Sequence, residues 1–482
     1  MRLFGQVLSQ EERELVHKKS IQILEEVGIK FPSERALTLL EKHGAKIDWD
    51  KQLAYISEAM VKDAMAKAPR EFVLGGREPE FSLALPSVDT IYNLDGGGIW
   101  TYEYETGKRR PSSIADIISA SRVFDEVDIG NAIWAPVSLS QGEIPSGAAG
   151  IFGIGTVFKN YRKHMQDEIV DTREVEYMVG ILKAITGSIE EVKRRKIYSV
   201  CYCTISPLAH EAEMLEANMD LSKYGVPIQT FPMPALGSTG PASLYSNLAM
   251  SNAETLSIFV VFQCETPGIP IIFGNAAGST NKRSGVILEG AVEATLVNCA
   301  MQDMATYYGF PSEMAGCLSD AKEPGMQAVL EKTLSSLPFV MAGADIIQGM
   351  GYLEASMTLS LEQILIDEEI AMMCKRLKDG INFSPEMDFF EDIKAVGPTG
   401  HFLKQKNTRA AFRSSEYYNP LLADRDTYED WIKLGSPDMY QNAHKRVREI
   451  LAGEPKNPLP VNVAKELDEI AETAKAMFLQ HK

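Results

Sequence analysis

The chain has 482 residues, with 48 Lys and Arg against 66 Asp and Glu, and its formal net charge of −18 argues against nucleic acid or an anionic membrane as the main partner. Its length permits up to three domains, although α/β barrels often exceed that size as one unit. It contains no run of 18 uncharged apolar residues, no positively flanked apolar leader and no disulfide-like spacing among its six cysteines, so we expect no membrane span and a cytoplasmic location.

Residues 1–88 are predicted to form an N-terminal helical cap. Leu15, Ile21 and Leu24 recur at helical spacing, and Gly28 is placed to end that helix. A second helix is expected near residues 33–43. No chemistry is apparent in this region.

Residues 89–380 alternate between strand and helix patterns eight times. The strand candidates are Thr90–Leu94, Ala132–Leu139, His164–Ile169, Lys196–Thr204, Val226–Met233, Pro270–Phe273, Glu313–Cys317 and Asp345–Gln348. The helix candidates are Ser113–Val127, Ala148–Tyr161, Thr172–Thr186, His210–Tyr224, Ser243–Cys264, Leu288–Tyr308, Met326–Met341 and Glu354–Leu377. This rhythm predicts an α/β fold, a (β/α)8 TIM barrel rather than an open sheet. Residues 381–482 are expected to form a C-terminal helical extension that packs on the barrel.

In such a barrel, functional side chains lie at the carboxyl ends of the strands. The segments that follow the predicted strands are rich in small, polar and acidic residues. They include Asp95–Gly98, Gln166–Glu168, Phe231–Ser238, Gly274–Asn275, Ser319–Lys322 and Gln348–Tyr352. We therefore expect the active site at this end of the barrel.

Most familiar catalytic motifs are absent. The glycines of Gly96–Gly98 and Gly274–Gly278 match neither a dinucleotide-binding nor a Walker loop. Cys201 and Cys203 share one face of a strand, but no further ligand lies at metal-binding spacing, so they are assigned to the core and no protein-bound metal is expected. Lys322, just past the seventh strand, leaves a Schiff-base lyase or aldolase as an alternative function.

Several separated motifs occur in an order that resembles the trimethylamine methyltransferase family, and the resemblance covers nearly the whole chain. They are Ser206–Leu208, Pro234–Pro241, Gln263, Pro270, Gly274, Ser319–Lys322 with Gln327, Asp367–Glu369, Gly400–Leu403, Thr408, Arg413, Pro420, Asp424, Arg425, Tyr428, Trp431 and Gly435. One departure is Asn407, which stands where the family often has His.

The resemblance implies a barrel enzyme that moves a methyl group from a methylated amine to the cobalt of a separate corrinoid protein. Members that use trimethylamine carry pyrrolysine. The larger branch without it acts on quaternary amines such as glycine betaine, proline betaine or carnitine. Because this sequence has only standard residues, the resemblance implies the second branch, with the corrinoid supplied by a partner protein. A homo-oligomer is left open, as is a non-catalytic quaternary-amine-binding protein.

A quaternary ammonium ion leaves as a neutral amine, so its demethylation needs no general acid and no Lewis-acid metal. The protein must instead hold the cation, and aromatic rings and carboxylates can do so. The predicted cage walls are Trp134, Phe231, Phe273 and Tyr352, and we expect Phe231 at the rim. The predicted carboxylates, which we assign as catalytic, are Asp95 and Glu168. Candidate groups for a substrate carboxylate are Arg283, Gln348, Ser238 and Thr239, and candidate corrinoid contacts are Gly96, Gly97, Gly98, Asn275 and His401.

Overall fold

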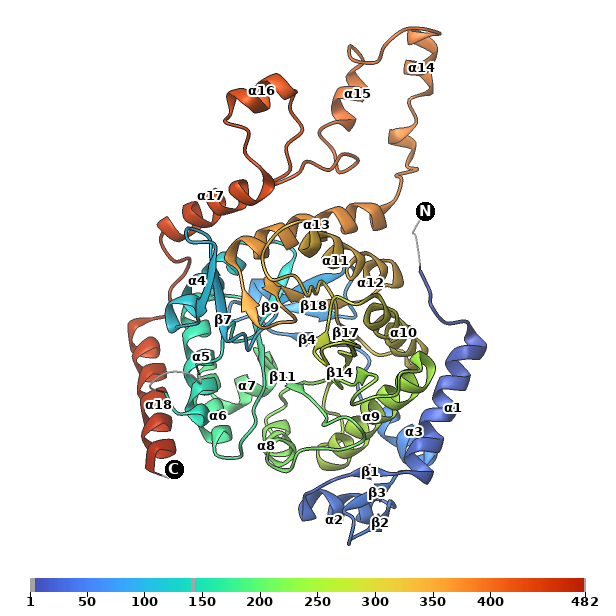
Figure 1. The fold of residues 1–482 in the computed structure, drawn as a ribbon, viewed down its shortest axis with the longest axis vertical. Coiled ribbons are helices and arrows are strands. Elements are labelled where there is room, and N and C mark those ends of the chain that lie inside the picture. Colours follow the sequence, from blue (N-terminus) through green and yellow to red (C-terminus); the bar gives the residue numbers. More distant parts are fainter. Residues whose placement is uncertain (1–4, 140–143, 481–482) are drawn as a thin grey trace.

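The computed structural model describes residues 5–139 and 144–480. Its centre is a closed barrel of eight parallel strands (Figure 1). The strands are β6 (Ile91–Leu94), β9 (Gly130–Ile133), β10 (His164–Asp167), β11 (Tyr198–Tyr202), β12 (Ile228–Thr230), β14 (Ile271–Asn275), β17 (Ser312–Ala315) and β18 (Ile346–Met350). Pairing of β18 with β6 closes the barrel. The predicted barrel is therefore confirmed, and each strand overlaps one of the eight predicted runs, although β9 shares only its last two residues with the predicted run Ala132–Leu139.

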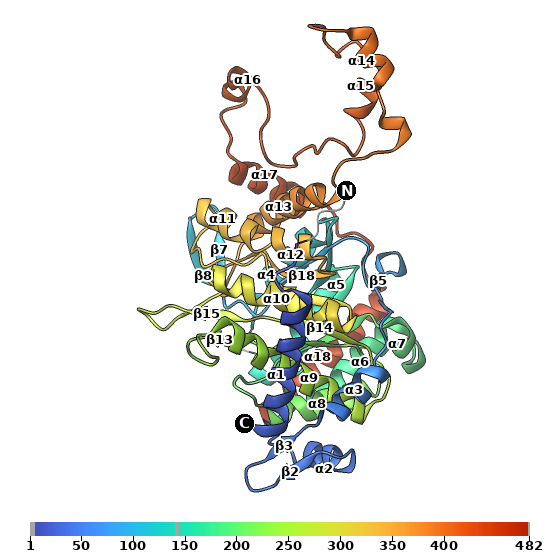
Figure 2. The same cartoon turned by 90° about the vertical axis from the view of Figure 1, so that its right-hand side faces the viewer.

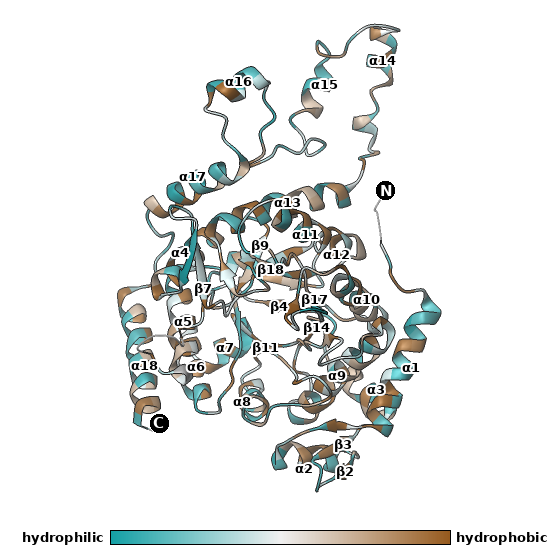
Figure 3. Ribbon diagram, viewed as in Figure 1, coloured by the Kyte–Doolittle hydropathy of each residue, from teal (hydrophilic) through white to brown (hydrophobic). Residues whose placement is uncertain are grey.

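Helices surround this barrel and bury the outer faces of its strands. They are α4 (Ile114–Asp125), α5 (Ser146–Asn160), α6 (Glu174–Thr186), α7 (Ile189–Arg195), α8 (Ala212–Ser222), α9 (Leu244–Glu265), α10 (Val292–Tyr308), α11 (Met326–Leu334), α12 (Leu337–Ala342) and α13 (Leu361–Asp379). Because both strand faces are covered, a strand such as Tyr198–Tyr202 is buried throughout. Coloured by hydropathy, the surface helices α1 and α18 show alternating polar and apolar residues (Figure 3).

The N-terminal part combines helices with short strands, so the predicted cap is not wholly helical. Helix α1 (Gln10–Glu26) begins with a capping box between Ser9 and Glu12, and α1 and α3 (Glu58–Lys67) both pack on α9. The remaining elements are α2 (Glu34–Lys42) and a three-stranded sheet of β1 (Ile29–Lys30), β3 (Leu53–Tyr55) and β2 (Lys46–Asp48).

A hairpin fills the amino-terminal end of the barrel. It consists of β4 (Phe72–Leu74) and β5 (Leu83–Leu85), joined by the short helix η1 (Pro79–Phe81). Leu74 and Leu85 are buried in one cluster with Ile272 of β14 and Ile346 of β18. These apolar contacts close the end of the barrel opposite to the carboxyl ends of the strands.

Two small sheets lie at the carboxyl ends of the barrel strands. One joins β7 (Trp100–Glu103), β8 (Lys108–Pro111), β19 (Tyr352–Leu353) and β20 (Thr358–Leu359). The other joins β13 (Ala235–Leu236), β15 (Gly278–Thr280) and β16 (Ile287–Leu288), and β15 extends well away from the barrel (Figure 2). None of these strands was predicted from the sequence.

The C-terminal extension packs on the barrel only in part. Helix α17 (Met439–Ala452) contacts α13 and α4, and α18 (Val461–Gln480) contacts α5 and α6. Residues 381–436, here called the arm, extend away from the barrel (Figures 1 and 2). The arm holds η2 (Pro385–Met387), α14 (Phe390–Val396), α15 (Lys406–Ala411) and α16 (Tyr428–Lys433). Within residues 5–139 and 144–480, no helix is both long enough and apolar enough to cross a membrane.

Candidate active site

Two aromatic side chains lie together inside the barrel at the carboxyl ends of its strands. Trp134 follows β9 and Phe231 follows β12, and their ring centroids are 6.2 Å apart. They form a small cluster, separate from the main core, with Cys201, Ala276, Ala315 and Leu318. The sequence predicts Phe231 at the rim of the barrel. Its exposed fraction is only 4%, so the side chain is instead buried below the rim. The structure thus brings together two of the four predicted cage residues.

A chain of buried hydrogen bonds holds the indole ring of Trp134 in place. Trp134 Nε1 donates to Gln166 Oε1 (2.8 Å), and Gln166 Nε2 donates to Glu313 Oε2 (3.0 Å). Asn93 Nδ2 donates to the other oxygen of Glu313, at 2.7 Å. Burial raises the pKa of Glu313 to about 7. Because every member of this chain has a partner, the plane of the indole is set before any ligand arrives.

A second group of polar side chains joins Asp95 to Glu289. The hydroxyl of Ser356 lies 2.7 Å from Asp95 Oδ2 and 2.7 Å from Glu289 Oε2. Gln348 Nε2 donates to the other oxygen of Asp95 at 3.2 Å. One hydroxyl hydrogen cannot serve two carboxylates at once. Burial and the neighbouring Asp95 raise the pKa of Glu289 to about 7, against the opposing effect of the Ser356 hydrogen bond.

The backbone that presents Ser356 is strained. Glu354, Ala355 and Ser356 have φ angles of 58°, 51° and 58°, in the left-handed region that residues with a Cβ rarely adopt. Backbone bonds from Glu354 to the carbonyl of Ala321 and from Ala355 to that of Ser319 hold this turn. Strain of this kind persists where the surrounding structure imposes it, often at functional sites.

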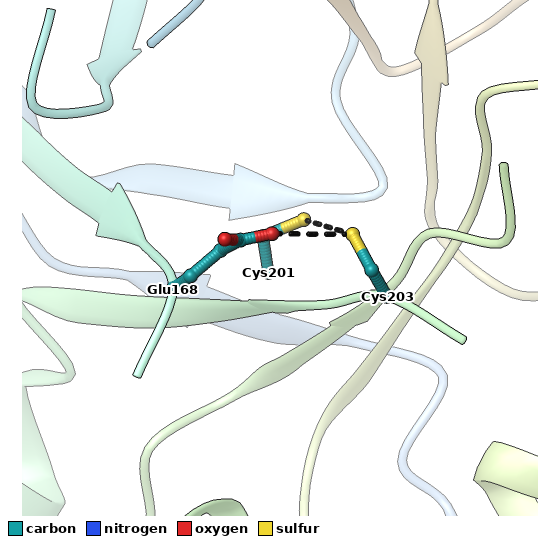
Figure 4. Close-up of side chains that lie close together, drawn as sticks. All are labelled: Glu168, Cys201 and Cys203. Carbon is teal, nitrogen blue, oxygen red and sulfur yellow. Dashed lines mark hydrogen bonds between the residues drawn. The ribbon is translucent and has the colours of Figure 1, made fainter. Parts of the chain in front are cut away.

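A third group, shown in Figure 4, consists of Glu168, Cys201 and Cys203. Cys203 Sγ lies 3.3 Å from Glu168 Oε1 and 4.0 Å from Cys201 Sγ. Burial raises the pKa of Glu168 and, with the neighbouring thiol, that of Cys201. The sequence assigned both cysteines to the core, yet Cys203 is only half-buried and contacts a predicted catalytic carboxylate.

These groups make the carboxyl end of the barrel strongly acidic. The pKa of Asp95 is raised by burial, and the cation that opposes this increase is Lys332. The Lys332 ammonium is fully buried and already bound to Asp367 at 2.9 Å. A ligand with permanent positive charge would therefore relieve the repulsion among Asp95, Glu168 and Glu289.

Two predicted site residues point away from the barrel interior. Phe273 packs against Phe259 and Tyr308 of the surrounding helices, with ring centroids 6.2 and 5.8 Å away. Asn275 is fully buried and donates to Asn298 of α10 at 2.7 Å. Since successive strand residues alternate in direction, the interior positions of β14 are Ile272 and Gly274. The cage role of Phe273 and the corrinoid contact of Asn275 are therefore wrong.

Other predicted residues lie outside the acidic end of the barrel. Arg283 is exposed in the loop between β15 and β16. Ser238 and Thr239 are exposed near this sheet, where Ser238 contacts Thr280 Oγ1 at 2.8 Å and Thr239 accepts from the Ala235 amide. His401 is exposed in the arm. None of these four side chains contacts Trp134, Asp95 or Glu168, so the structure does not support the predicted grouping.

The remaining predicted residues pack around the site. A Cβ at Gly96 would collide with Trp134, a Cβ at Gly98 would collide with Tyr352, and Gly97 has a φ of 75°. These glycines therefore let the loop after β6 lie close to both rings. Tyr352 is buried in the main core, and burial and the charge of Asp95 raise its pKa. Lys322 is exposed and donates to the carbonyl of Asp320 in its own loop, at 2.6 Å.

Sequence reasoning missed Glu289, Ser356 and Glu313. The first two were assigned to predicted helices that began at Leu288 and Glu354, whereas α10 and α13 begin at Val292 and Leu361. Glu313 was recognised as part of a strand but not as part of the site. An acidic residue inside an otherwise apolar strand was the one available signal, because a buried carboxyl needs partners.

Comparison with known proteins identifies the family of this chain. The family model described as trimethylamine methyltransferase (MTTB) matches residues 4–478. The trimethylamine methyltransferase MttB of Methanosarcina barkeri (strain Fusaro) is 30% identical over 472 residues, which cover 97% of this chain and 95% of that protein.

A glycine betaine methyltransferase of Desulfitobacterium hafniense (strain Y51) is 29% identical over 463 residues, which cover 96% of this chain and 95% of that protein. The crystal structure of the M. barkeri monomethylamine methyltransferase aligns with 91% of this chain and 92% of its own, at 11% identity and a TM-score of 0.49. The family match over almost the whole chain shows that this protein belongs to the trimethylamine methyltransferase family.

Proposed function

We propose that this protein transfers a methyl group from a quaternary amine that also bears a carboxylate, such as a betaine, to the Co(I) of a corrinoid carried by a partner protein. The observation that supports it best is the acidic barrel end, where the charge of Asp95 acts on both Glu168 and Glu289 and where the rings of Trp134 and Phe231 pack together. Family membership and relatives named for trimethylamine and glycine betaine support the same class of reaction.

The reaction requires little of the protein beyond placement. Co(I) supplies the electron pair of the new Co–C bond, and the breaking C–N bond leaves its pair on nitrogen. A neutral tertiary amine and a methyl-Co(III) corrinoid result, without proton transfer. The protein must therefore hold the cation with one methyl group directed towards the partner. Aromatic faces and carboxylates bind such a cation by cation–π and Coulomb attraction.

A substrate panel tests this proposal. Purified protein is mixed with cob(I)alamin and glycine betaine, proline betaine, carnitine or trimethylamine, and methylation is followed by cobalamin absorbance. We expect methyl transfer from one or more of the zwitterions and little from trimethylamine, because the chain has only standard residues. Robust use of trimethylamine without any betaine activity would refute the proposed specificity.

Two variants test the site itself. Asp95→Asn removes a carboxylate while keeping its shape, and we expect at least a tenfold loss in kcat/KM. Lys322→Ala should retain activity, because its ammonium is exposed and bound to its own loop. Loss of activity in Lys322→Ala, with borohydride trapping of substrate on the wild type, would instead support the Schiff-base alternative. A protein that binds betaines without any methyl transfer would be the non-catalytic binder.

A further inference from the structure

The group formed by Glu168, Cys201 and Cys203 has the composition and size of a metal site. Its three ligand atoms all lie within 4.8 Å of one another. A tetrahedral zinc ion with Zn–S bonds of about 2.3 Å and a Zn–O bond of about 2.0 Å requires S···S and S···O separations of roughly 3.8 and 3.5 Å. The corresponding distances here are 4.0 Å between the sulfurs and 3.3 Å from Cys203 Sγ to Glu168 Oε1. Small side-chain shifts would complete this geometry.

The backbone holds these ligands in place. Strands β10 and β11 pair in parallel, with Asp167 level with Val200, so the next residues, Glu168 and Cys201, follow at the same level. Cys203 lies two residues further along and therefore on the same face as Cys201. The three ligands thus come from adjacent strand ends rather than from a flexible loop, and their convergence was invisible in the sequence spacing.

The contacts of Glu168 and Cys203 with residues 5–139 and 144–480 favour the binding of a cation. Within the described part of the chain, the one side-chain donor to the Glu168 carboxylate is the Cys203 thiol, a weak donor. The nearby charges acting on Glu168 and Cys203 are acidic, including Asp95. Met233 Sδ lies 3.9 Å from Cys203 Sγ, so a further soft atom borders the group.

We propose that Glu168, Cys201 and Cys203 bind a thiophilic divalent cation, most simply Zn²⁺, at the carboxyl end of the barrel. Binding releases the two thiol protons and places a dication among three anionic ligands. Three protein ligands leave a fourth position for water or a substrate oxygen, as in zinc sites that bind substrates. If the proposed function holds, a metal ion at this position offers positive charge to the carboxylate of a betaine. Arg283, the arginine predicted for that role, is instead exposed in the loop between β15 and β16.

Metal content tests the site directly, without substrate. The full-length protein is purified in reductant, dialysed against a chelator, reloaded with Zn²⁺, desalted and measured by elemental analysis. We expect about one zinc per chain in the wild type and less than about a tenth of that in Glu168→Gln and Cys203→Ser. Cys264→Ser is the matched control, since Cys264 is also half-buried but lies on α9, and it should keep one zinc.

Cobalt substitution adds a spectroscopic test. Co²⁺ in place of Zn²⁺ should give thiolate-to-cobalt charge-transfer absorption that persists in Cys264→Ser and disappears in Cys203→Ser. Cys203 is chosen because it is only half-buried, whereas Cys201 is a fully buried member of the aromatic cluster, so its substitution would disturb packing more. Failure of the wild type to retain zinc, or equal retention in Glu168→Gln and Cys203→Ser, would overturn the metal site. Methyl transfer from betaines is measured separately, so either proposal can fail alone.

Discussion

The aromatic pair provides a residue-scale test of the cation cage. Phe231→Ala would leave a cavity costing about 3–5 kcal/mol, because Phe231 is buried against Trp134. Phe231→Leu removes the aromatic face with less loss of volume, and we expect kcat/KM to fall about tenfold, the equivalent of ~1.4 kcal/mol of cation–π attraction. Phe231→Tyr should retain most activity.

Phe273→Leu is the matched control, because Phe273 is as deeply buried but contacts the helices. Thermal denaturation and steady-state kinetics of these four variants separate loss of packing from loss of the cation–π contact. If Phe273→Leu loses as much kcat/KM as Phe231→Leu, the loss reflects packing rather than the cage.

Glu289 predicts a pH dependence of substrate binding. Its pKa is raised to about 7 by burial, with Asp95 and Asp320 raising it further and Lys332 opposing them. Below pH 7 the carboxyl is mainly protonated, so its attraction for a cation appears as pH rises through about 7. We therefore expect KM for a quaternary amine to fall over this range and then level.

The variant Glu289→Gln should have a higher KM and lack this inflection. Initial rates at saturating corrinoid, measured between pH 6 and 8.5, give the comparison. An unchanged inflection in Glu289→Gln would assign the titration to another group.

At the scale of elements, the sequence located the barrel strands but not their inward and outward faces. Strands covered on both sides are apolar throughout, so nothing in Pro270–Phe273 showed that Phe273 points outward. The predicted helices also began too early, so that Glu289 and Ser356 were assigned to helices although they lie in the segments before α10 and α13. Asp95, Glu168 and Phe231 were selected because the sequence placed them at or just after the ends of predicted strands, and Trp134 was selected only as an aromatic residue inside a longer predicted strand. Partners supplied by distant loops require the folded chain.

One buried carboxylate ties the arm to the barrel. Glu369 of α13 accepts bonds from the Tyr418 hydroxyl and from the amides of Leu421 and Leu422, at 2.7 to 2.8 Å. Each bond to a charged acceptor contributes about 1.5–3 kcal/mol. We expect Glu369→Ala to raise the rates of hydrogen exchange and of protease cleavage across residues 416–422. Glu369→Gln keeps one side-chain oxygen for the amides of Leu421 and Leu422, so both rates should rise less in that variant. Protection unaffected in Glu369→Ala would show that other contacts hold the segment.

At the scale of the whole molecule, the arm exposes large apolar side chains that the single chain leaves uncovered. Phe383, Leu403 and Tyr428 have exposed fractions of 76%, 69% and 69%, and such surfaces commonly mark association sites. The homo-oligomer left open by the sequence stays a prediction, and the arm gives it a location. Light scattering should give a mass above the 53.2 kDa of one chain. The double variant Phe383→Ser, Leu403→Ser should shift the measured mass towards that of the monomer. The control variant Leu330→Ser, which changes an exposed leucine on α11, should not.

The β4–β5 hairpin fills the amino-terminal end of the barrel, with Leu74 and Leu85 packed against Ile272 and Ile346. Small molecules then reach Trp134 and Asp95 past the carboxyl ends of the strands, where the proposed corrinoid partner would also dock. A docked partner would seal the amine inside. We therefore expect ordered kinetics in which the amine binds before the methyl acceptor and the demethylated amine departs after it. Demethylated amine should accordingly inhibit competitively against the methyl donor, and excess partner should slow turnover by occluding the empty enzyme.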